Sequence, residues 1–379
     1  MDDQVHNEAG GNPVCRRSTR IPTYYLKVQK VRSEIIYFQR SQNLEPIRKG
    51  GLLIFLWDII GVENYNKLIT VRNEFIFVVK LLAINHSSNS LNLNKRKLIR
   101  RKVRSVWKAY YQNKPVILKE CDSLRMTFEE FFNTQVIYKL LNKTMKVPKP
   151  LSFRGKYLVE SYLPGETREW PLLHVPRKLC LSLPEYYAAL RYLIELHNSK
   201  PPKSWLSLKV EQYGGCSLRD KLSDDYCKLK KLNSKISKEK INELKGIEKY
   251  IPSERSYLVL SHGDFKPDNL IINKSKGNIE IGAIDWIDLG LRQRQYDLGS
   301  LLFGLKCDTL MDLVDYYITH SKINVIDRFK FAKEAIAVAC ITHVNAPLGS
   351  QQKESDKRWA FAIIDYAYSI IHRIESTVA

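Results

Sequence analysis

One segment constrains the fold of this chain more than any other: LSHGDFKPDNLIINKSKGNIEIGAIDW, residues 260–286. Two apolar runs, at 269–272 and 279–284, flank the turn-forming sequence NKSKGN. This pattern predicts a β-hairpin. Because the start of the first strand of a hairpin lies beside the end of the second, we expect Asn269 and Asp285 to be neighbours.

The side chains around this hairpin suit phosphoryl transfer. Asn269 and Asp285 offer an amide oxygen and a carboxylate, which are hard ligands of the kind that Mg²⁺ prefers. Asp264, on the loop just before the hairpin, is placed to accept a proton from an incoming hydroxyl group. The order His262-Gly-Asp264, then Asn269 and later Asp285, follows the catalytic-loop pattern H-R-D-x-x-x-x-N with its later metal-binding Asp.

The sequence HGDFKPDN followed by IDWIDLGLRQRQYDLGSLL resembles the aminoglycoside phosphotransferase and choline kinase-like family. Members of that family share the protein-kinase fold and use ATP to phosphorylate hydroxyl groups of small molecules. The resemblance covers roughly residues 95–305. It implies an α+β fold with a small mixed lobe and a larger helical lobe, with ATP and Mg²⁺ bound between the lobes. The implied acceptors are of the aminoglycoside or choline type.

The resemblance also implies roles for particular residues. Asp264 matches the catalytic base, and Asn269 and Asp285 match the Mg²⁺ ligands. Lys119, which ends the sequence VILK, matches the strand lysine that contacts the α- and β-phosphates. Lys266 matches a loop lysine of protein kinases and is expected to steady the γ-phosphate.

Further roles follow from the same resemblance. The sequence LVESYLPGE matches the hinge, where backbone groups near Glu160 and Tyr162 would meet adenine. Asp297 matches an aspartate that is usually structural, and His262 is given an orienting role. The helix glutamate that should pair with the strand lysine stays open among three positions: Glu129, Glu130 and Gln135.

The length of 379 residues favours more than one lobe or domain. We expect a disordered tail, an extension of unknown role, a nucleotide-binding lobe and a helical lobe that holds the catalytic and acceptor groups. Their predicted ranges are 1–22, 23–94, 95–162 and 163–379.

Local patterns predict the main elements. They are a hairpin over 95–119 with its turn at 112–115, a helix over 126–143 with acids in its first turn, a strand near 157–160, a helix over 182–199 with a Ser cap, and helical regions at 217–250 and 308–379. The segment 73–85 is ambiguous between helix and strand.

Departures from the kinase pattern leave other functions open. The chain has Asp-Trp-Ile where ordinary protein kinases have Asp-Phe-Gly, and RSVWKAYY at 104–111 replaces the Gly-rich loop. A protein serine/threonine kinase is the nearest alternative, favoured by Lys266. A pseudokinase scaffold is a second alternative, favoured by the missing glycines and by an alignment that places Gln135 opposite Lys119.

The formal net charge of +21 raises a third alternative, nucleic-acid binding, with KRKLIRRKVR at 95–104 as its candidate surface. A solvated strand face and a compositional bias toward Lys account for the same charge. The polar, acidic start of the chain is unlike a secretory signal, and the most apolar stretch, 51–62, is too short to span a bilayer. The seven Cys form no CxxC pair, which favours a reducing compartment. We therefore expect a cytoplasmic protein.

Overall fold

The computed structural model describes residues 94–101, 105–168, 180–200, 218–232, 234–252, 258–275, 277–349 and 354–378. All of these described residues belong to one compact unit. The predicted tail at 1–22, the ambiguous segment at 73–85 and all but the last residue of the predicted extension lie outside the described residues.

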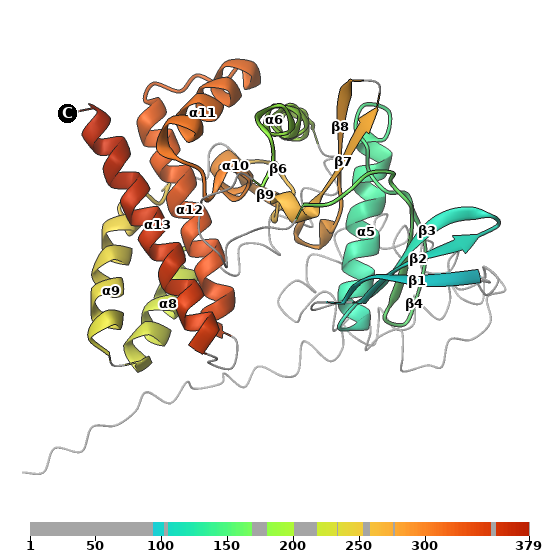
Figure 1. Ribbon diagram of the computed structural model, residues 1–379, viewed down its shortest axis with the longest axis horizontal. Helices are drawn as coiled ribbons and strands as arrows, with labels where there is room; N and C mark the ends of the chain where they lie inside the picture. The colour runs from blue at the N-terminus through green and yellow to red at the C-terminus, as the bar shows by residue number, and fades with distance from the viewer. Residues whose placement is uncertain are drawn as a thin grey trace, which may run out of the picture. The chain divides into compact units, whose positions relative to one another are not determined.

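The amino-terminal part of the described chain is a five-stranded antiparallel sheet with the order β1-β2-β3-β5-β4 (Figure 1). Its strands are β1 (Asn94–Arg101), β2 (Ser105–Tyr111), β3 (Lys114–Glu120), β4 (Pro150–Arg154) and β5 (Tyr157–Ser161).

The predicted hairpin turn lies at Gln112 and Asn113, which both adopt positive φ between β2 and β3. The strand near 157–160 is also confirmed, as β5. The sequence did not predict β1 and β4 as separate strands. Both are edge strands with a register shift, and β4 starts at a proline, so neither carries the regular alternation of a central strand.

One long helix, α5 (Leu124–Leu141), follows β3. It begins two residues before the predicted start because the Ser123 side chain accepts a hydrogen bond from the backbone N of Met126, at 3.2 Å. The prediction of acids in the first turn is therefore wrong: Glu129 and Glu130 fall in the second turn, and Glu130 is buried. Glu130 is the acid of this helix that reaches the sheet, at Lys119.

Apolar side chains hold the sheet on both of its faces. Val116, Leu118 and Val159 pack on one face, and Leu158 packs on the other against Phe131 of α5. The second half of α5 contributes to the large core of the helical part. The helix α5 therefore belongs to both parts of the fold.

The hairpin predicted from residues 260–286 is present, as β7 (Leu270–Ser275) and β8 (Asn278–Ala283). Leu270 pairs with Ala283, and the register continues without a shift to the turn. Short 3-10 turns flank the hairpin: η2 (Pro267–Asn269) before it and η3 (Trp286–Asp288) after it. In addition, β6 (Leu258–Ser261) pairs with β9 (Gly290–Gln293).

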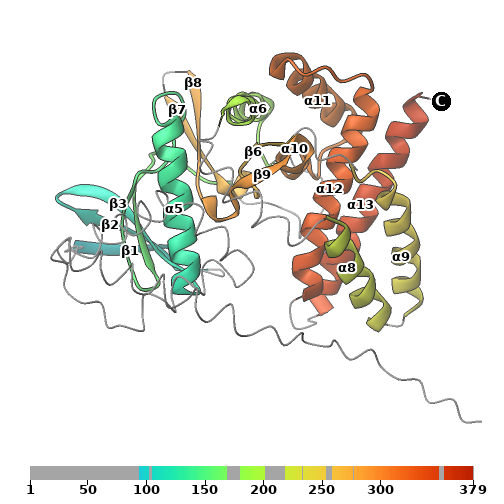
Figure 2. The ribbon, with the colours of Figure 1, turned by 180° about the vertical axis from the view of Figure 1, so that it is seen from behind.

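Helices make up most of the remaining described chain, and both ribbon views show α8, α9, α12 and α13 running side by side (Figures 1 and 2). The helices are α6 (Leu183–Asn198), α8 (Leu218–Leu232), α9 (Lys235–Glu248), α10 (Arg294–Leu302), α11 (Cys307–Ser321), α12 (Arg328–Gly349) and α13 (Glu354–Val378). The predicted helical regions are confirmed, including the capping box of α6 between Ser182 and Glu185. Within the described parts of the chain, every helix is too short or too polar to cross a bilayer.

Candidate active site

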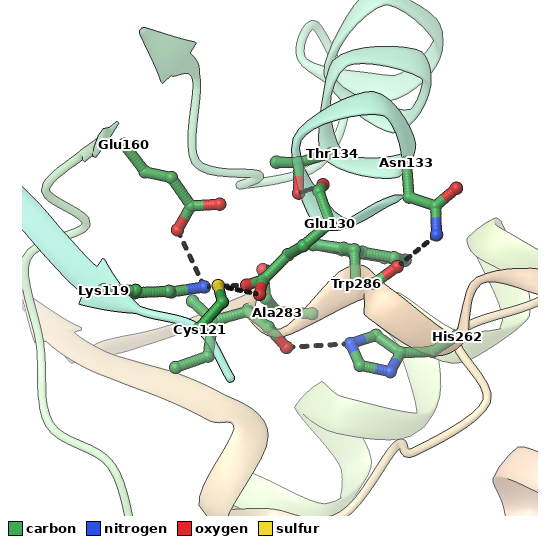
Figure 3. A network of polar contacts seen from close by, with 10 residues as sticks. Lys119, Cys121, Glu130, Asn133, Thr134, Glu160, His262, Ala283 and Trp286 are labelled. Carbon is green, nitrogen blue, oxygen red and sulfur yellow. Dashed lines mark hydrogen bonds and ion pairs between the residues drawn. The ribbon is translucent and has the colours of Figure 1, made fainter. Parts of the chain in front are cut away.

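A buried lysine on the sheet is held between two carboxylates. The Nζ atom of Lys119, on β3, lies 2.5 Å from Oε1 of Glu130 and 2.8 Å from Oε2 of Glu160 (Figure 3). The side chain of Glu130 is fully buried and that of Glu160 is 2% exposed. Cys121 lies beside the other oxygen of Glu130, with Sγ 3.7 Å from Oε2. The site thus has one buried ammonium for two buried carboxylates.

The charges of this cluster shift the pKa values of its members. Burial alone would lower the pKa of Lys119, but Glu130, Glu160 and Asp285 outweigh it, so that pKa lies above its ordinary value and Lys119 is charged. Burial raises the pKa of Glu130 to about 7, although Lys119 acts in the opposite direction. Asp285 and Glu160 add to the rise. The cluster therefore carries excess negative charge when its carboxylates are ionised.

The structure identifies the partner of the strand lysine as Glu130, one of the three residues left open by the sequence. The alignment with Gln135 is not the one adopted. Glu160 was predicted only as a hinge residue acting through its backbone, and its side-chain contact with Lys119 was missed. The strand alternation could have indicated this contact, because Glu160 follows Leu158 by two residues on the α5 face of β5.

The segment before the hairpin brings three predicted site residues into contact. One oxygen of Asp264, Oδ2, accepts a hydrogen bond from Nδ2 of Asn269 at 2.8 Å and lies 2.7 Å from Nζ of Lys266. Nδ2 of Asn269 also donates to the backbone oxygen of Asp264, at 2.9 Å. Burial alone would lower the pKa of Lys266, but the neighbouring acids Asp264, Asp268 and Asp285 have the larger effect. The pKa therefore lies above its ordinary value, and Lys266 is charged. A fixed cation therefore lies against the predicted base.

His262 orients this loop as a neutral ring. Burial lowers its pKa, and its Nδ1 accepts a hydrogen bond from the backbone N of Asp264, at 3.3 Å. The proton is therefore on Nε2, which donates to the backbone oxygen of Ile284, at 3.0 Å. The ring links the loop that carries Asp264 to the strand end that precedes Asp285.

Asp297, at the start of α10, fixes the backbone of the same loop. Its Oδ2 and Oδ1 accept hydrogen bonds from the backbone N atoms of His262 and Gly263, at 2.8 and 2.9 Å. The Nε2 atom of His197 lies 3.1 Å from Oδ2. The carboxylate is fully buried, and its pKa is below the ordinary range because these contacts, first that of His197, overcome the effect of burial. The structural role implied for Asp297 agrees with these contacts.

Gly263 is required by the close packing at this loop. Its φ is +87°, and a Cβ atom there would lie 2.2 Å from the backbone oxygen of Asp288. A side chain at this position is excluded by both the conformation and the contact. The glycine between His262 and Asp264 therefore lets the loop approach the turn that follows the hairpin.

Asp285 ends the hairpin in a left-handed conformation, with φ 66° and ψ 59°. The backbone N of Ile284 donates to the backbone oxygen of Asn269 at 3.0 Å, so the predicted adjacency of the two strand ends is confirmed. Because the Asn269 amide turns its Nδ2 toward Asp264, its Oδ1 atom faces the other way and suits a metal ion. One amide oxygen and one carboxylate fit Mg²⁺, which usually keeps several waters.

Tyr162 follows Glu160 by two residues in the chain. It follows β5, its backbone N donates to the oxygen of Pro115 at 3.4 Å, and the Nζ atom of Lys108 lies 4.1 Å from the centre of its ring. The hinge role of Glu160 and Tyr162 stays a prediction.

Comparisons with known proteins place the chain in a family. The model of the phosphotransferase enzyme family matches residues 103–330, which is more than half of the sequence. The chain belongs to the phosphotransferase enzyme family. The match spans every residue of the candidate site, from Lys119 to Asp297. No curated protein matched the chain in a sequence search.

Solved structures of phosphotransferases share the fold. The spectinomycin phosphotransferase APH(9)-Ia, in complex with ADP and spectinomycin, has a TM-score of 0.50 and 13% identity, over 78% of this chain and 98% of that chain. The GDP complex of aminoglycoside 2'-phosphotransferase-IIIa has a TM-score of 0.51 and 15% identity, over 80% of this chain and 99% of that chain. At this identity the likeness concerns the fold, and it confirms the predicted two-lobed, kinase-like α+β architecture.

Proposed function

We propose that this phosphotransferase moves the γ-phosphoryl group of ATP to a hydroxyl group of a small molecule, with Mg²⁺. The observation that carries the proposal is the hydrogen bond from Asn269 to Asp264. It couples the expected base to an expected metal ligand, and the Asn269 backbone is bonded to the residue before Asp285. A base and metal ligands held together beside the open end of one hairpin are what an in-line phosphoryl transfer needs.

The residues of the chain would divide the work as follows. Asp264 takes the proton of the acceptor hydroxyl while the hydroxyl oxygen bonds to the γ-phosphorus of ATP. The bond between the γ-phosphorus and the β–γ bridging oxygen breaks, and ADP is released. Lys266, 2.7 Å from Asp264, holds the γ-phosphoryl group near the base. Lys119 positions the α- and β-phosphates while Glu130 orients its ammonium group. Asn269 and Asp285 would hold Mg²⁺, which neutralises phosphate charge when bound.

The test is ADP release from ATP in the presence of a panel of hydroxyl acceptors, including aminoglycosides, choline and ethanolamine. D264N should lower turnover by about 10²- to 10⁴-fold, the usual contribution of a positioned base, while the affinity for ADP changes little. D312N, an Asp-to-Asn change at an exposed position on α11, is the matched control. If D264N turns over as fast as the parent chain, Asp264 is not the base.

The protein serine/threonine kinase remains a second candidate because Lys266 contacts the base as a loop lysine of protein kinases would. Incubation with [γ-³²P]ATP separates the two, since label would move to protein in one case and to small hydroxyl compounds in the other. The pseudokinase alternative loses its argument from Gln135, because the Lys119–Glu130 ion pair is intact. Nucleic-acid binding and a cytoplasmic location remain predictions from composition.

A further inference from the structure

We propose that Asn133 is a positioning residue that fixes α5 to the turn after Asp285, so that one helix sets both the lysine–glutamate pair and the metal-binding carboxylate. The inference rests on the proposed function, because it concerns the use of Asp285 as an Mg²⁺ ligand. Asn133 belongs to neither the catalytic loop nor the hairpin, and no sequence motif pointed to it.

The contact of Asn133 joins two segments that are far apart in the chain. Its Nδ2 donates to the backbone oxygen of Trp286, at 3.0 Å (Figure 3), and to that of Ile287, at 2.9 Å. The side chain is fully buried. Both amide hydrogens are thus used on the turn that immediately follows Asp285.

The amide oxygen of Asn133 gives no competing reason for the orientation of the side chain. The Oδ1 atom of Asn133 is buried and has no hydrogen-bond partner among the described residues. An apolar side chain of similar size would avoid that unsatisfied oxygen. The presence of a buried asparagine at position 133 is therefore explained by the two hydrogen bonds that its Nδ2 donates to the turn.

Helix geometry couples this contact to the phosphate-binding lysine. Asn133 follows Glu130 by three residues, so both side chains lie on the same face of α5. Glu130 reaches Lys119 on the sheet, and Asn133 reaches the turn at 286–287. The hydroxyl of Thr134 donates to the backbone oxygen of Glu130, at 2.7 Å, a bond within the helix alone. A shift of α5 along its axis would disturb the lysine and the turn together.

The turn needs such support because Asp285 adopts a left-handed conformation that residues other than glycine rarely adopt. The Trp286 oxygen that accepts from Asn133 also accepts from the backbone N of Leu289, at 3.2 Å, and closes the 3-10 turn. The indole nitrogen of Trp286 donates to the oxygen of Ala283, at 3.0 Å. The two hydrogen bonds from Asn133 connect this turn to α5, and they fix the direction in which the Asp285 carboxylate leaves the turn.

The experiment measures ADP binding by calorimetry over a series of Mg²⁺ concentrations, so no acceptor is needed. In N133L, which removes both donors, the Mg²⁺ concentration for half-maximal ADP binding should rise by about 10- to 100-fold, as for other groups that orient metal ligands. T134V is the matched control: it also replaces a buried polar side chain on α5, but one without a bond to the turn. T134V should leave the Mg²⁺ dependence unchanged.

The outcomes separate this inference from the proposed function. If the parent chain shows no Mg²⁺-dependent ADP binding, the proposed function fails and the inference fails with it. If the parent chain binds and N133L has the same Mg²⁺ dependence, the inference alone is overturned. An equal shift in T134V would also overturn it, since the effect would then belong to the stability of α5.

A second measurement covers the case in which N133L does not fold. Hydrogen exchange of the parent chain, with and without Mg²⁺ and ADP, should show protection rising together at 124–141 and 283–289. Protection that rises at 283–289 alone would mean that α5 is not coupled to the turn, and would overturn the inference.

Discussion

Replacing Lys119 by methionine tests the charge balance of the buried cluster. Met keeps much of the apolar stem of lysine and removes the ammonium that two buried carboxylates share. Breaking a buried ion pair by removing one partner typically costs about 3–5 kcal/mol. At about 2–4 °C for each kcal/mol, the melting temperature of K119M should fall by roughly 6–20 °C.

The loss should depend on pH, with a sign that follows from Glu130. Burial already raises the pKa of Glu130 to about 7 against the opposing effect of Lys119, and without Lys119 this pKa rises further. A carboxyl with a raised folded pKa costs stability above its unfolded pKa of about 4.3, because there the unfolded state ionises more readily than the folded state. Below that value it is protonated in both states. The gap between K119M and the parent chain should therefore be widest at pH 8 and shrink toward pH 5.

The assay is thermal melting of both chains at pH 8 and pH 5. K228M is the matched control, because Lys228 also lies close to a carboxylate, 2.6 Å from Asp224, but on the surface of α8. A surface pair of this kind is worth about 0–1 kcal/mol, so K228M should melt near the parent chain. If K119M melts with the parent chain at pH 8, or if its deficit is the same at both pH values, the cluster is not held by the charge of Lys119.

Two further perturbations follow from the same structure. E160Q removes the second carboxylate from Lys119 and so leaves the ammonium more available to phosphate. In calorimetric titration ADP should bind more tightly by about fivefold, or about 1 kcal/mol. Weaker binding would contradict this reasoning. G299A should destabilise the chain by about 1–3 kcal/mol in thermal melting, because a Cβ there would lie 2.0 Å from the backbone oxygen of Ala335 on α12. In the control G246A the nearest atom is a side-chain carbon of Tyr368 at 3.0 Å, so equal losses in both variants would argue against the α10–α12 contact as the cause.

The hairpin of β7 and β8 could be predicted from sequence because its information is local. The turn residues and the two apolar runs set the register, and the register alone brings Asn269 next to the strand end that carries Asp285. The helix α6 was equally accessible, since Ser182 and Glu185 form its cap within four residues. Where pairing depends on neighbours in the chain, the sequence predicts it directly.

Contacts between distant segments were harder to predict. The partner of Lys119 depends on which face of α5 turns toward β3, and the sequence of the helix does not show how it packs on the sheet. Glu160 and Asn133 act through buried contacts whose partners lie on other elements, at separations that no local pattern marks. Which charged groups share a buried site can be worked out only once the fold is known.

The segment that follows β5 has a mechanical consequence. Glu166 and Ile272 exchange two backbone hydrogen bonds, at 3.0 and 2.8 Å, so the chain is fastened to β7 only a few residues after it leaves the sheet. Between Ser161 and Glu166 the sequence is Tyr-Leu-Pro-Gly, in which the proline ring already fixes one torsion. Any tilting of the sheet against the hairpin is thereby confined to rotations about the few backbone bonds between Ser161 and Glu166.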